Sequence, residues 1–344
     1  MDAARARTET DEKAPRRHIV VYSSGRSGSN RLLDIFDQHE LTNCRNEIDV
    51  CDPVFDAFCT EADLRLSEPL AARWSALVQR STFRKGDRDR FQLSHKRYLR
   101  DFPARLWGAA MRRRLRRHVL RIASDDWAIP GVILHPRAQA DIVPVFKVSR
   151  PQRFLAATHA AMPAQTVVHN IREPEKYLNS WYNRLVVPEY NGDLEAVYRL
   201  NRATAQEELR RNGMDVKLDE AFSLRALLVA ELWNWRLCNE PIHEALRGSP
   251  RYRLVHYNEI STAPEETARR LFMHAGLEFT AMHAARIAAL RNTLFASPHA
   301  ARLDPVAVQE AADEVLSDCP VCRFAQDQAF HAPHDAGPGA RGLP

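Results

Sequence analysis

Four apolar runs rich in β-branched residues alternate with helix-like segments along the chain. The runs are HIVVYS (18–23), IVPVFKV (142–148), TVVHNI (166–171) and YRLVHY (252–257). After each run, apolar residues recur at spacings of three and four, starting near Ser29, Arg153, Glu175 and Pro264. Continuous apolar strands that alternate with helices are typical of a parallel sheet covered on both faces. The pattern predicts an α/β fold, a three-layer sandwich around a central parallel sheet.

Two mostly helical insertions separate these units, at about 52–130 and 189–247. The second contains AFSLRALLVAELWNWRLCNEPIHEAL, whose apolar spacing predicts a packed helix with Trp233 and Trp235 in the core. Residues 1–17 are charged, and residues 331–344 are rich in Pro and Gly, so we expect a disordered leader and tail. One domain over 18–330 accounts for the remainder.

Composition narrows the class of protein. Hydrophobic residues make up 45% of the 344 residues and charged residues 27%, as in soluble globular proteins. The chain has no run of about 18 apolar residues, and its first residues lack an apolar signal segment. Six cysteines are spread along it, so we expect a cytoplasmic protein with free thiols. For Cys319 and Cys322, in CPVC, a structural role is favoured over a zinc or redox site.

The net charge of +5 comes largely from residues 84–121, which are dense in Arg and Lys. We favour an exposed helical face whose Leu and Trp turn inward; peripheral contact with lipid head groups or an anionic acceptor is the alternative. A basic nucleic-acid-binding protein is a competing interpretation. No recognised binding motif accompanies the stretch, so nucleic acid is not the expected partner.

The first loop, SSGRSGSN (23–30), follows the first strand and precedes a helix. Ligands of open parallel sheets bind at such strand ends. Gly25 and Gly28 are expected to allow positive φ angles that turn backbone N–H groups inward, and Ser27 and Ser29 add hydroxyl donors. With the positive end of the helix, this makes a cradle for phosphate or sulfate. The loop lacks the Gly-Lys-Ser/Thr of a Walker A motif, which argues against a P-loop kinase.

The third strand unit predicts a second anion site. In HNIREPEKYLNSWYNR, Arg172 ends the strand and Pro174 starts a helix. Ser180 follows eight residues after Arg172, on the second helical turn. Both side chains can converge on one anion. Two anion sites over one sheet suit a ligand that carries phosphates at both ends.

At this point the chain resembles a known family, the PAPS-dependent sulfotransferases. SSGRSGSNRLL resembles their 5′-phosphosulfate loop, in the Arg-Ser-Gly form of the carbohydrate and tyrosylprotein branches, and HNIREPEKYLNSWYNR resembles their 3′-phosphate motif. RLVHYNEISTAPEETARRLFMHAGLEF resembles a later family segment. The similarity covers about 18–50, 142–185 and 250–280. It implies a P-loop-NTPase-like fold and a sulfuryl transfer from 3′-phosphoadenosine 5′-phosphosulfate (PAPS), with PAP as product and no metal required.

The resemblance also implies roles for individual residues. The implied ligands of the nucleotide are Arg26, Ser27, Gly28, Ser29, Asn30, Arg172 and Ser180, with Tyr257 and Ser297 as weaker carry-overs. The implied catalytic residues are Glu47 as general base, Arg26 at the bridging oxygen, and Lys147 at a strand end.

The chain departs from the family in two places. Asn30 stands where members usually have Ser or Thr, and the usual Trp and Lys after the late Ser are absent around Ser297. Asp49, Asp52 and, with less support, His39 are reserve candidates for the base. The Arg-Ser-Gly loop with a nearby Glu favours a carbohydrate or glycolipid hydroxyl as acceptor. The acceptor pocket itself falls in the insertions, to which the resemblance does not extend.

Overall fold

The computed structural model describes residues 16–25, 27–46, 68–81, 96, 141–149, 152–186, 190, 192–291 and 303–321. All statements below concern these residues. The expected leader (except residues 16 and 17), the tail and most of the first insertion lie outside them. The basic stretch 84–121 does too, apart from Lys96.

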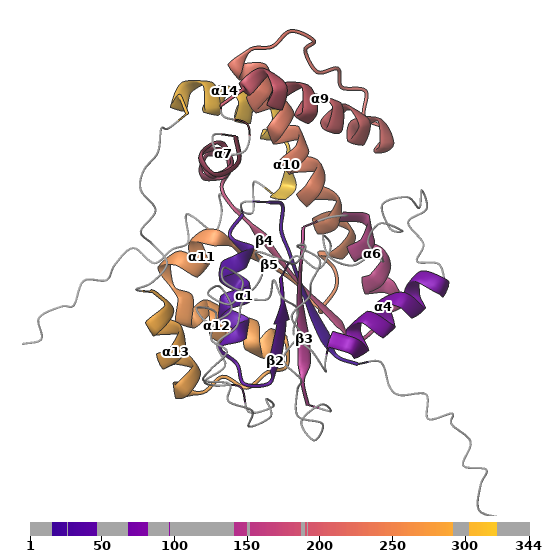
Figure 1. Cartoon of the computed structure of the whole chain (residues 1–344), viewed down its shortest axis with the longest axis vertical. Coiled ribbons are helices and arrows are strands. Elements are labelled where there is room, and N and C mark those ends of the chain that lie inside the picture. Colours follow the sequence, from indigo (N-terminus) through magenta and orange to yellow (C-terminus); the bar gives the residue numbers. More distant parts are fainter. Residues whose placement is uncertain are drawn as a thin grey trace, which may run out of the picture. The chain divides into compact units, whose positions relative to one another are not determined.

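The described strands form one five-stranded parallel sheet (Figure 1). Its strands are β1 (His18–Tyr22), β2 (Thr42–Arg45), β3 (Val143–Val148), β4 (Gln165–Ile171) and β5 (Tyr252–His256), in the order β2-β3-β1-β4-β5. β2 runs parallel to β3, with Thr42 opposite Val143 and Arg45 opposite Phe146. β1, β3 and β4 are buried along their whole length, as their unbroken apolar runs predict. The predicted parallel α/β class is confirmed.

Strand β2 is the one described strand that the apolar pattern does not predict. Its sequence is TNCR, and Thr42, Asn43 and Cys44 are nevertheless buried. The Thr42 hydroxyl donates to the His39 carbonyl at 2.9 Å, and Asn43 Nδ2 donates to the Ser81 carbonyl. Buried polar groups with hydrogen-bond partners are compatible with a core. A hydropathy pattern does not reveal those partners.

The chain divides into two compact units, residues 1–21 with 33–167, and residues 22–32 with 168–344. The first contains most of α1 (Ser29–Asp37), together with α4 (Glu68–Ser81) and α6 (Gln152–Ala161). In its core, Trp74 of α4 packs against Phe146 at 5.2 Å between ring centroids and against His18 at 5.7 Å. Lys96 is buried there too, and its Nζ contacts the Asp37 carboxylate at 3.1 Å and the Thr42 carbonyl at 3.0 Å. Burial of this lysine is therefore balanced by an ion pair.

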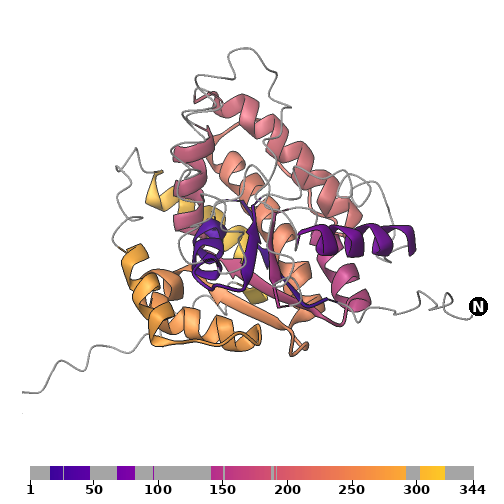
Figure 2. The same ribbon diagram turned by 60° about the horizontal axis from the view of Figure 1, so that its bottom comes forward.

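The second unit is mainly helical. It holds α7 (Pro174–Trp181), a π-helical turn (Tyr182–Val186), α9 (Leu194–Arg211), α10 (Leu224–Leu246), α11 (Tyr257–Thr262), α12 (Pro264–His274), α13 (Ala281–Arg291) and α14 (Pro305–Leu316). α10 packs against α9 and α14, while α12 and α13 lie side by side (Figures 1 and 2). Trp233 and Trp235 of α10 are 7% and 1% exposed, so both belong to the core as predicted. None of the described helices has the length and hydropathy to cross a membrane.

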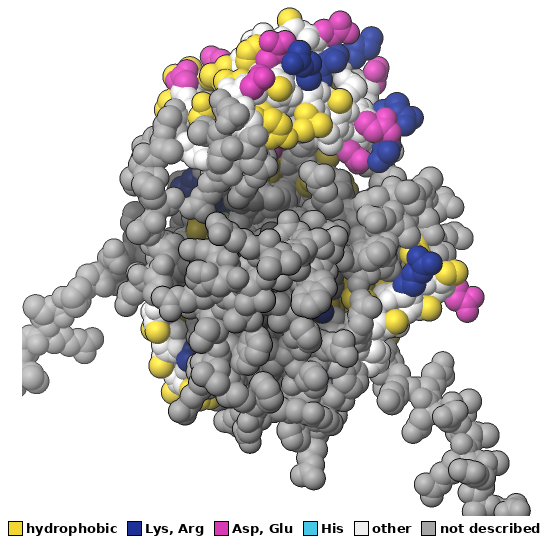
Figure 3. Space-filling model, viewed as in Figure 1, with side chains coloured by type: hydrophobic (Ala, Val, Ile, Leu, Met, Phe, Trp, Pro, Cys, Tyr) yellow, Lys and Arg dark blue, Asp and Glu magenta, His cyan; other side chains and the backbone are white. Residues whose placement is uncertain are grey.

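Surface charge on α9 is mixed. Figure 3 shows acidic and basic side chains side by side over this helix. Glu207 pairs with both Arg210 and Arg211, and Arg199 pairs with Glu195. These exposed pairs at three- and four-residue spacings stabilise a helix only slightly. The face of α9 is consequently a solvated surface and not a basic patch for an anionic partner.

Candidate functional site

The loop after β1 and the start of α1 form the first part of the candidate site. Ser27 and Ser29 are buried, and α1 begins at Ser29 as predicted. Gly28 has a φ of +91°, a left-handed conformation that favours glycine. Gly25 is exposed and does not adopt a positive φ, so the sequence prediction was wrong for this residue. The left-handed turn is made at Gly28 alone of the two, directly before the helix.

The aromatic ring of Tyr257 joins this loop to Arg172. Tyr257 is the first residue of α11, and its ring lies so close to Gly28 that a Cβ there would collide with Cδ2 and Cε2. On the ring, the guanidinium carbon of Arg172 lies 4.6 Å from the centroid. A guanidinium over an aromatic face is stabilised by the cation–π interaction. Gly28, Tyr257 and Arg172 therefore form a continuous stack, which we call the Gly28–Tyr257–Arg172 stack.

The turn that carries Arg172 is fixed to α11 by a second contact. β4 ends at Ile171, Glu173 is the N-cap of α7, and Pro174 occupies its first turn as predicted. The Glu173 carboxylate accepts a hydrogen bond from Asn258 Nδ2, next to Tyr257. Lys176 Nζ binds the same carboxylate oxygen at 3.2 Å. These contacts place Tyr257 over the strand end, where Arg172 can remain stacked on it.

Ser180 lies on the second turn of α7, as predicted, and is half-buried. Its neighbour Asn179 accepts, through Oδ1, a hydrogen bond of 3.0 Å from the backbone N–H of Leu303. Leu303 is the first residue described after the segment that contains Ser297. The chain after Ser297 thus returns to the helix that carries Ser180.

A network of buried polar side chains holds the first loop. Ser24 Oγ and Ser27 Oγ lie 2.7 Å apart, and Asn239 Nδ2 of α10 donates to Ser24 Oγ at 3.3 Å. Asn170 Nδ2 of β4 donates to the Ser27 carbonyl. The Asn170 Oδ1 atom is buried with no hydrogen-bond partner within the described part of the chain. Two segments far from the loop in sequence, β4 and α10, therefore hold Ser24 and Ser27 in place.

His169 connects Asn239 to Tyr252 in the same network. Its Nε2 lies 2.9 Å from Asn239 Oδ1, and its Nδ1 lies 2.8 Å from the Tyr252 hydroxyl. Tyr252 in turn lies 3.1 Å from His243 Nδ1. Burial lowers the pKa of His169 from 6.5 to about 4, more than the hydrogen bond to Asn239 raises it. The imidazole is therefore neutral at physiological pH.

We expect His169→Gln to make stability less dependent on pH. Because the pKa of His169 is about 4 when folded and 6.5 when unfolded, the unfolded state binds more protons as the pH falls below 6.5. Stability is lost through this window and levels off below pH 4. From pH 7 to pH 5 this group lowers the free energy of unfolding by about 2 kcal/mol. Urea unfolding of both proteins at the two pH values measures the difference, and equal pH dependence would contradict it.

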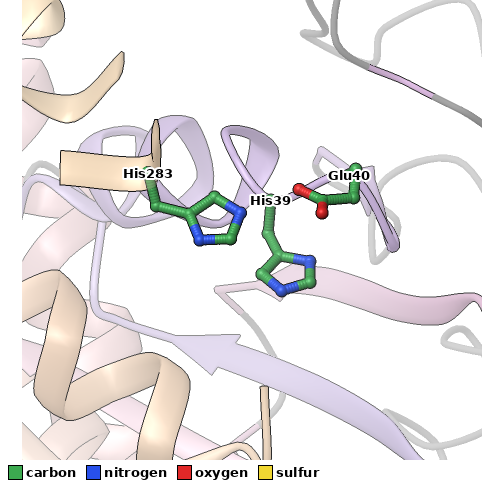
Figure 4. A group of neighbouring side chains, drawn as sticks. All are labelled: His39, Glu40 and His283. Carbon is green, nitrogen blue, oxygen red and sulfur yellow. The ribbon is translucent and has the colours of Figure 1, made fainter. Parts of the chain in front are cut away.

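Two other predicted site residues, Lys147 and His39, belong to the first unit. Lys147 is the fifth residue of β3 in the first unit, with 7% of its surface exposed. His39 follows α1, and its Nδ1 accepts the N–H of Leu41 at 3.1 Å; Glu40 is next to it in Figure 4. His283, also drawn there, is in α13, where its Nδ1 accepts the N–H of Thr280 at 3.0 Å. Both imidazoles thus have local structural roles. Outside the described residues lie Arg26, Glu47, Asp49, Asp52, Ser297 and Cys322.

The residues of the network that sequence reasoning missed include His169, Asn170 and Asn239. A signal existed for two of them, because His and Asn inside the apolar run TVVHNI must be buried and must have partners. The sequence offers no such signal for Asn239, because the apolar spacing of α10 is that of an ordinary packed helix. Cys319 is buried, beyond the end of α14.

Comparison with known proteins gives structural similarities only. No family model matches the chain, and no curated protein matches its sequence. Among solved structures, the sulfotransferase domain of a Synechococcus olefin synthase is 15% identical and has a TM-score of 0.41; 94% of this chain and 98% of that one are covered. A sulfotransferase from Alicyclobacillus acidocaldarius is 12% identical with a TM-score of 0.41, covering 90% and 96%. A mouse sulfotransferase complexed with PAP is 10% identical with a TM-score of 0.40, covering 92% and 91%.

Proposed function

We propose that this protein is a PAPS-dependent sulfotransferase. The proposal depends on the site residues. Three features support it: a parallel sheet, a glycine-containing loop between β1 and α1, and an arginine at the end of β4. Strand ends of such sheets are where anionic ligands bind.

The observation that carries the proposal is the Gly28–Tyr257–Arg172 stack. Arg172 and the first loop carry the two predicted anion sites, and one aromatic ring touches both. A ligand with two phosphate groups on one nucleoside suits two cationic or N–H-rich sites that contact the same ring. PAPS carries its 5′-phosphosulfate and 3′-phosphate on one ribose. Ser27, Gly28, Ser29 and Asn30 would bind the 5′ end, and Arg172 with Ser180 the 3′-phosphate.

The chemistry proposed is an in-line transfer. An acceptor oxygen forms a bond to sulfur while the bond from sulfur to the bridging oxygen of the 5′-phosphate breaks, which releases PAP. The acceptor's hydroxyl proton passes to a carboxylate, for which Glu47 remains our candidate. Fixed donors and cations around the transferred group stabilise its charge, with Arg26 and Lys147 proposed for this role. The loop has no Walker Lys-Ser/Thr pair for a magnesium-bound triphosphate, consistent with a reaction that requires no metal.

The acceptor class is proposed from the Arg-Ser-Gly form of the loop. We propose a hydroxyl of a carbohydrate or glycolipid and a cytoplasmic location.

Binding of PAP tests the nucleotide assignment directly. We expect calorimetry to give a dissociation constant for PAP in the micromolar range or below, without added metal, and labelled PAPS to transfer sulfate to a sugar or glycolipid in an acceptor panel that includes phenols. Magnesium-dependent ATP hydrolysis in place of PAP binding would favour a kinase-like enzyme. Salt-sensitive binding of DNA or RNA without PAP affinity would favour a nucleic-acid-binding protein.

A further inference from the structure

A chain of hydrogen bonds runs from the half-buried His243 to the first loop, through Tyr252, His169, Asn239 and Ser24 to Ser27. From His243 to Ser24, the direction in which each hydrogen bond is donated follows from the partners. Together these residues form what we call the Ser27 relay. No role in nucleotide binding follows for them from the sequence resemblance, except for Ser27.

The orientation of the Asn239 amide fixes the first direction. Asn239 Nδ2 lies 2.6 Å from the carbonyl oxygen of Trp235, which can only accept. The atom at this position is therefore the NH₂ group, and the amide oxygen faces His169 Nε2 at 2.9 Å. Because an amide oxygen is only an acceptor, His169 Nε2 must carry the hydrogen. The same NH₂ group donates its second hydrogen to Ser24 Oγ.

The state of His169 fixes the directions on the other side. Burial lowers the pKa of His169 to about 4, so the ring has one N–H at neutral pH. With that hydrogen on Nε2, Nδ1 accepts from the Tyr252 hydroxyl. The single hydrogen of Tyr252 is thereby used, and His243 Nδ1 donates to the phenol oxygen.

At the loop end of the relay, the hydrogen bond is between the hydroxyls of Ser24 and Ser27. Ser24 Oγ accepts from Asn239 and is 2.7 Å from Ser27 Oγ. Either serine can donate in this contact, and each direction leaves one hydroxyl hydrogen unused. Donation from Ser24 leaves that hydrogen on Ser27, in the loop, and this is the direction on which the relay depends. Ser27 is 0% exposed, so its own hydrogen has no bulk water to bind. With Ser24 as the donor, an oxygen of an anion held by the loop would supply the acceptor for the Ser27 hydrogen.

We propose that the Ser27 relay orients the Ser27 hydroxyl as a donor toward the anion bound in the loop, with Ser24 and Asn239 as positioning residues. The anion in question is the 5′-phosphosulfate, so this role rests on the proposed function. Because the Ser27 hydrogen would then not be bound to another acceptor, Ser27 would break no hydrogen bond in order to donate to the anion. Preorganised donors of this kind favour an anion over a neutral ligand.

The tautomer of His169 tests the relay without any ligand. In protein labelled with ¹⁵N at histidine, the resonances absent from His169→Gln identify this ring. At pH 7 we expect a protonated Nε2 and an unprotonated Nδ1. A hydrogen on Nδ1 instead, or hydrogens on both nitrogens, would overturn the relay whether or not the protein binds PAP.

The coupling of Ser24 to Ser27 tests its effect on the anion. We expect Ser27→Ala to weaken PAP binding about ten- to a hundredfold, as for loss of a hydrogen bond to a charged group. Ser24→Ala should cost part of this, and the double variant should be no weaker than Ser27→Ala alone, because Ser24 acts only through Ser27. Ser24→Thr keeps the hydroxyl and should restore affinity.

Tyr22→Phe is the matched control. Its hydroxyl donates at 2.8 Å to the carbonyl of Cys238, the residue before Asn239, but it is not part of the relay. Its affinity for PAP should equal that of the wild type. Additive losses in the Ser24 and Ser27 variants, or an equal loss in Tyr22→Phe, would overturn the relay while PAP binding by the wild type leaves the proposed function intact. If the wild type binds no PAP, the proposed function fails, and the same variants are compared with inorganic phosphate as the probe.

Discussion

Replacing Gly28 with Ala is expected to abolish measurable PAP binding and to destabilise the protein. Two costs add at this position. The left-handed backbone, with φ of +91°, costs an L-residue about 1–2 kcal/mol. The new Cβ would also collide with the Tyr257 ring, and overpacking of this kind typically costs about 1–3 kcal/mol. If Tyr257 moves to relieve the overlap, it leaves Arg172, and the two anion sites lose their common support.

Gly213→Ala is the control for backbone strain. Gly213 also has a left-handed φ, of +69°, but a Cβ there would have no atom within 4 Å. Its substitution should cost stability by the backbone term alone, about 1–2 kcal/mol, and should leave PAP affinity unchanged. Urea unfolding and calorimetry on both variants separate the two terms. The excess cost of Gly28→Ala measures the collision with Tyr257.

A double-mutant cycle assigns this excess to the ring. In a Tyr257→Ala background the collision is absent, so Gly28→Ala should then cost only what Gly213→Ala costs. If Gly28→Ala lowers the free energy of unfolding as much in the Tyr257→Ala background as in the wild type, Tyr257 does not limit the space at Gly28. Unchanged PAP affinity in Gly28→Ala would be incompatible with a nucleotide bound against this loop.

The sheet and the ends of its strands could be predicted from the sequence because burial leaves a direct signal. The apolar runs around β1, β3, β4 and β5 are interrupted by few polar residues, and helix starts follow from Ser29, Pro174 and Pro264. β2 was missed because its polar side chains have buried partners that hydropathy does not reveal, the His39 carbonyl for Thr42 and, 38 residues away, the Ser81 carbonyl for Asn43. Gly25 was assigned a positive φ from its residue type alone, and the backbone at that position does not need one.

The candidate site was predicted in part for a similar reason. Arg172 and Gly28 belong to local motifs, so their positions at a strand end and before a helix follow from the sequence. That one aromatic ring touches both follows from the packing of α11, 229 residues after Gly28 (257 − 28 = 229), which a local pattern does not encode. The same is true of Asn239, which reaches Ser24 from the middle of α10. Contacts of this kind join residues far apart in sequence, so only the three-dimensional structure reveals them.

Arg172→Ala should weaken PAP binding about a hundredfold or more while leaving the affinity for adenosine 5′-monophosphate within about threefold. The reason is that the two ligands differ in the 3′-phosphate, the group we propose for Arg172. A guanidinium can bind phosphate through two charge-assisted hydrogen bonds, each contributing about 1.5–3 kcal/mol. Calorimetry with both nucleotides yields the ratio of affinities, which should fall toward one in the variant.

Two further variants, Arg172→Lys and Arg199→Ala, test whether the loss of PAP affinity comes from the guanidinium group of Arg172. Lysine keeps the charge but lacks the planar group that stacks on Tyr257 and binds two oxygens, so we expect a loss of about tenfold for PAP. Arg199 lies on the solvated face of α9, with 69% of its side chain exposed, and its removal should change neither affinity. An equal loss for both nucleotides in Arg172→Ala would place Arg172 at the 5′ end or in the support of the loop. If Arg172→Ala lowers the affinity for neither nucleotide, Arg172 does not form a second anion site. A ligand with a single phosphate group would then be enough to fill the site.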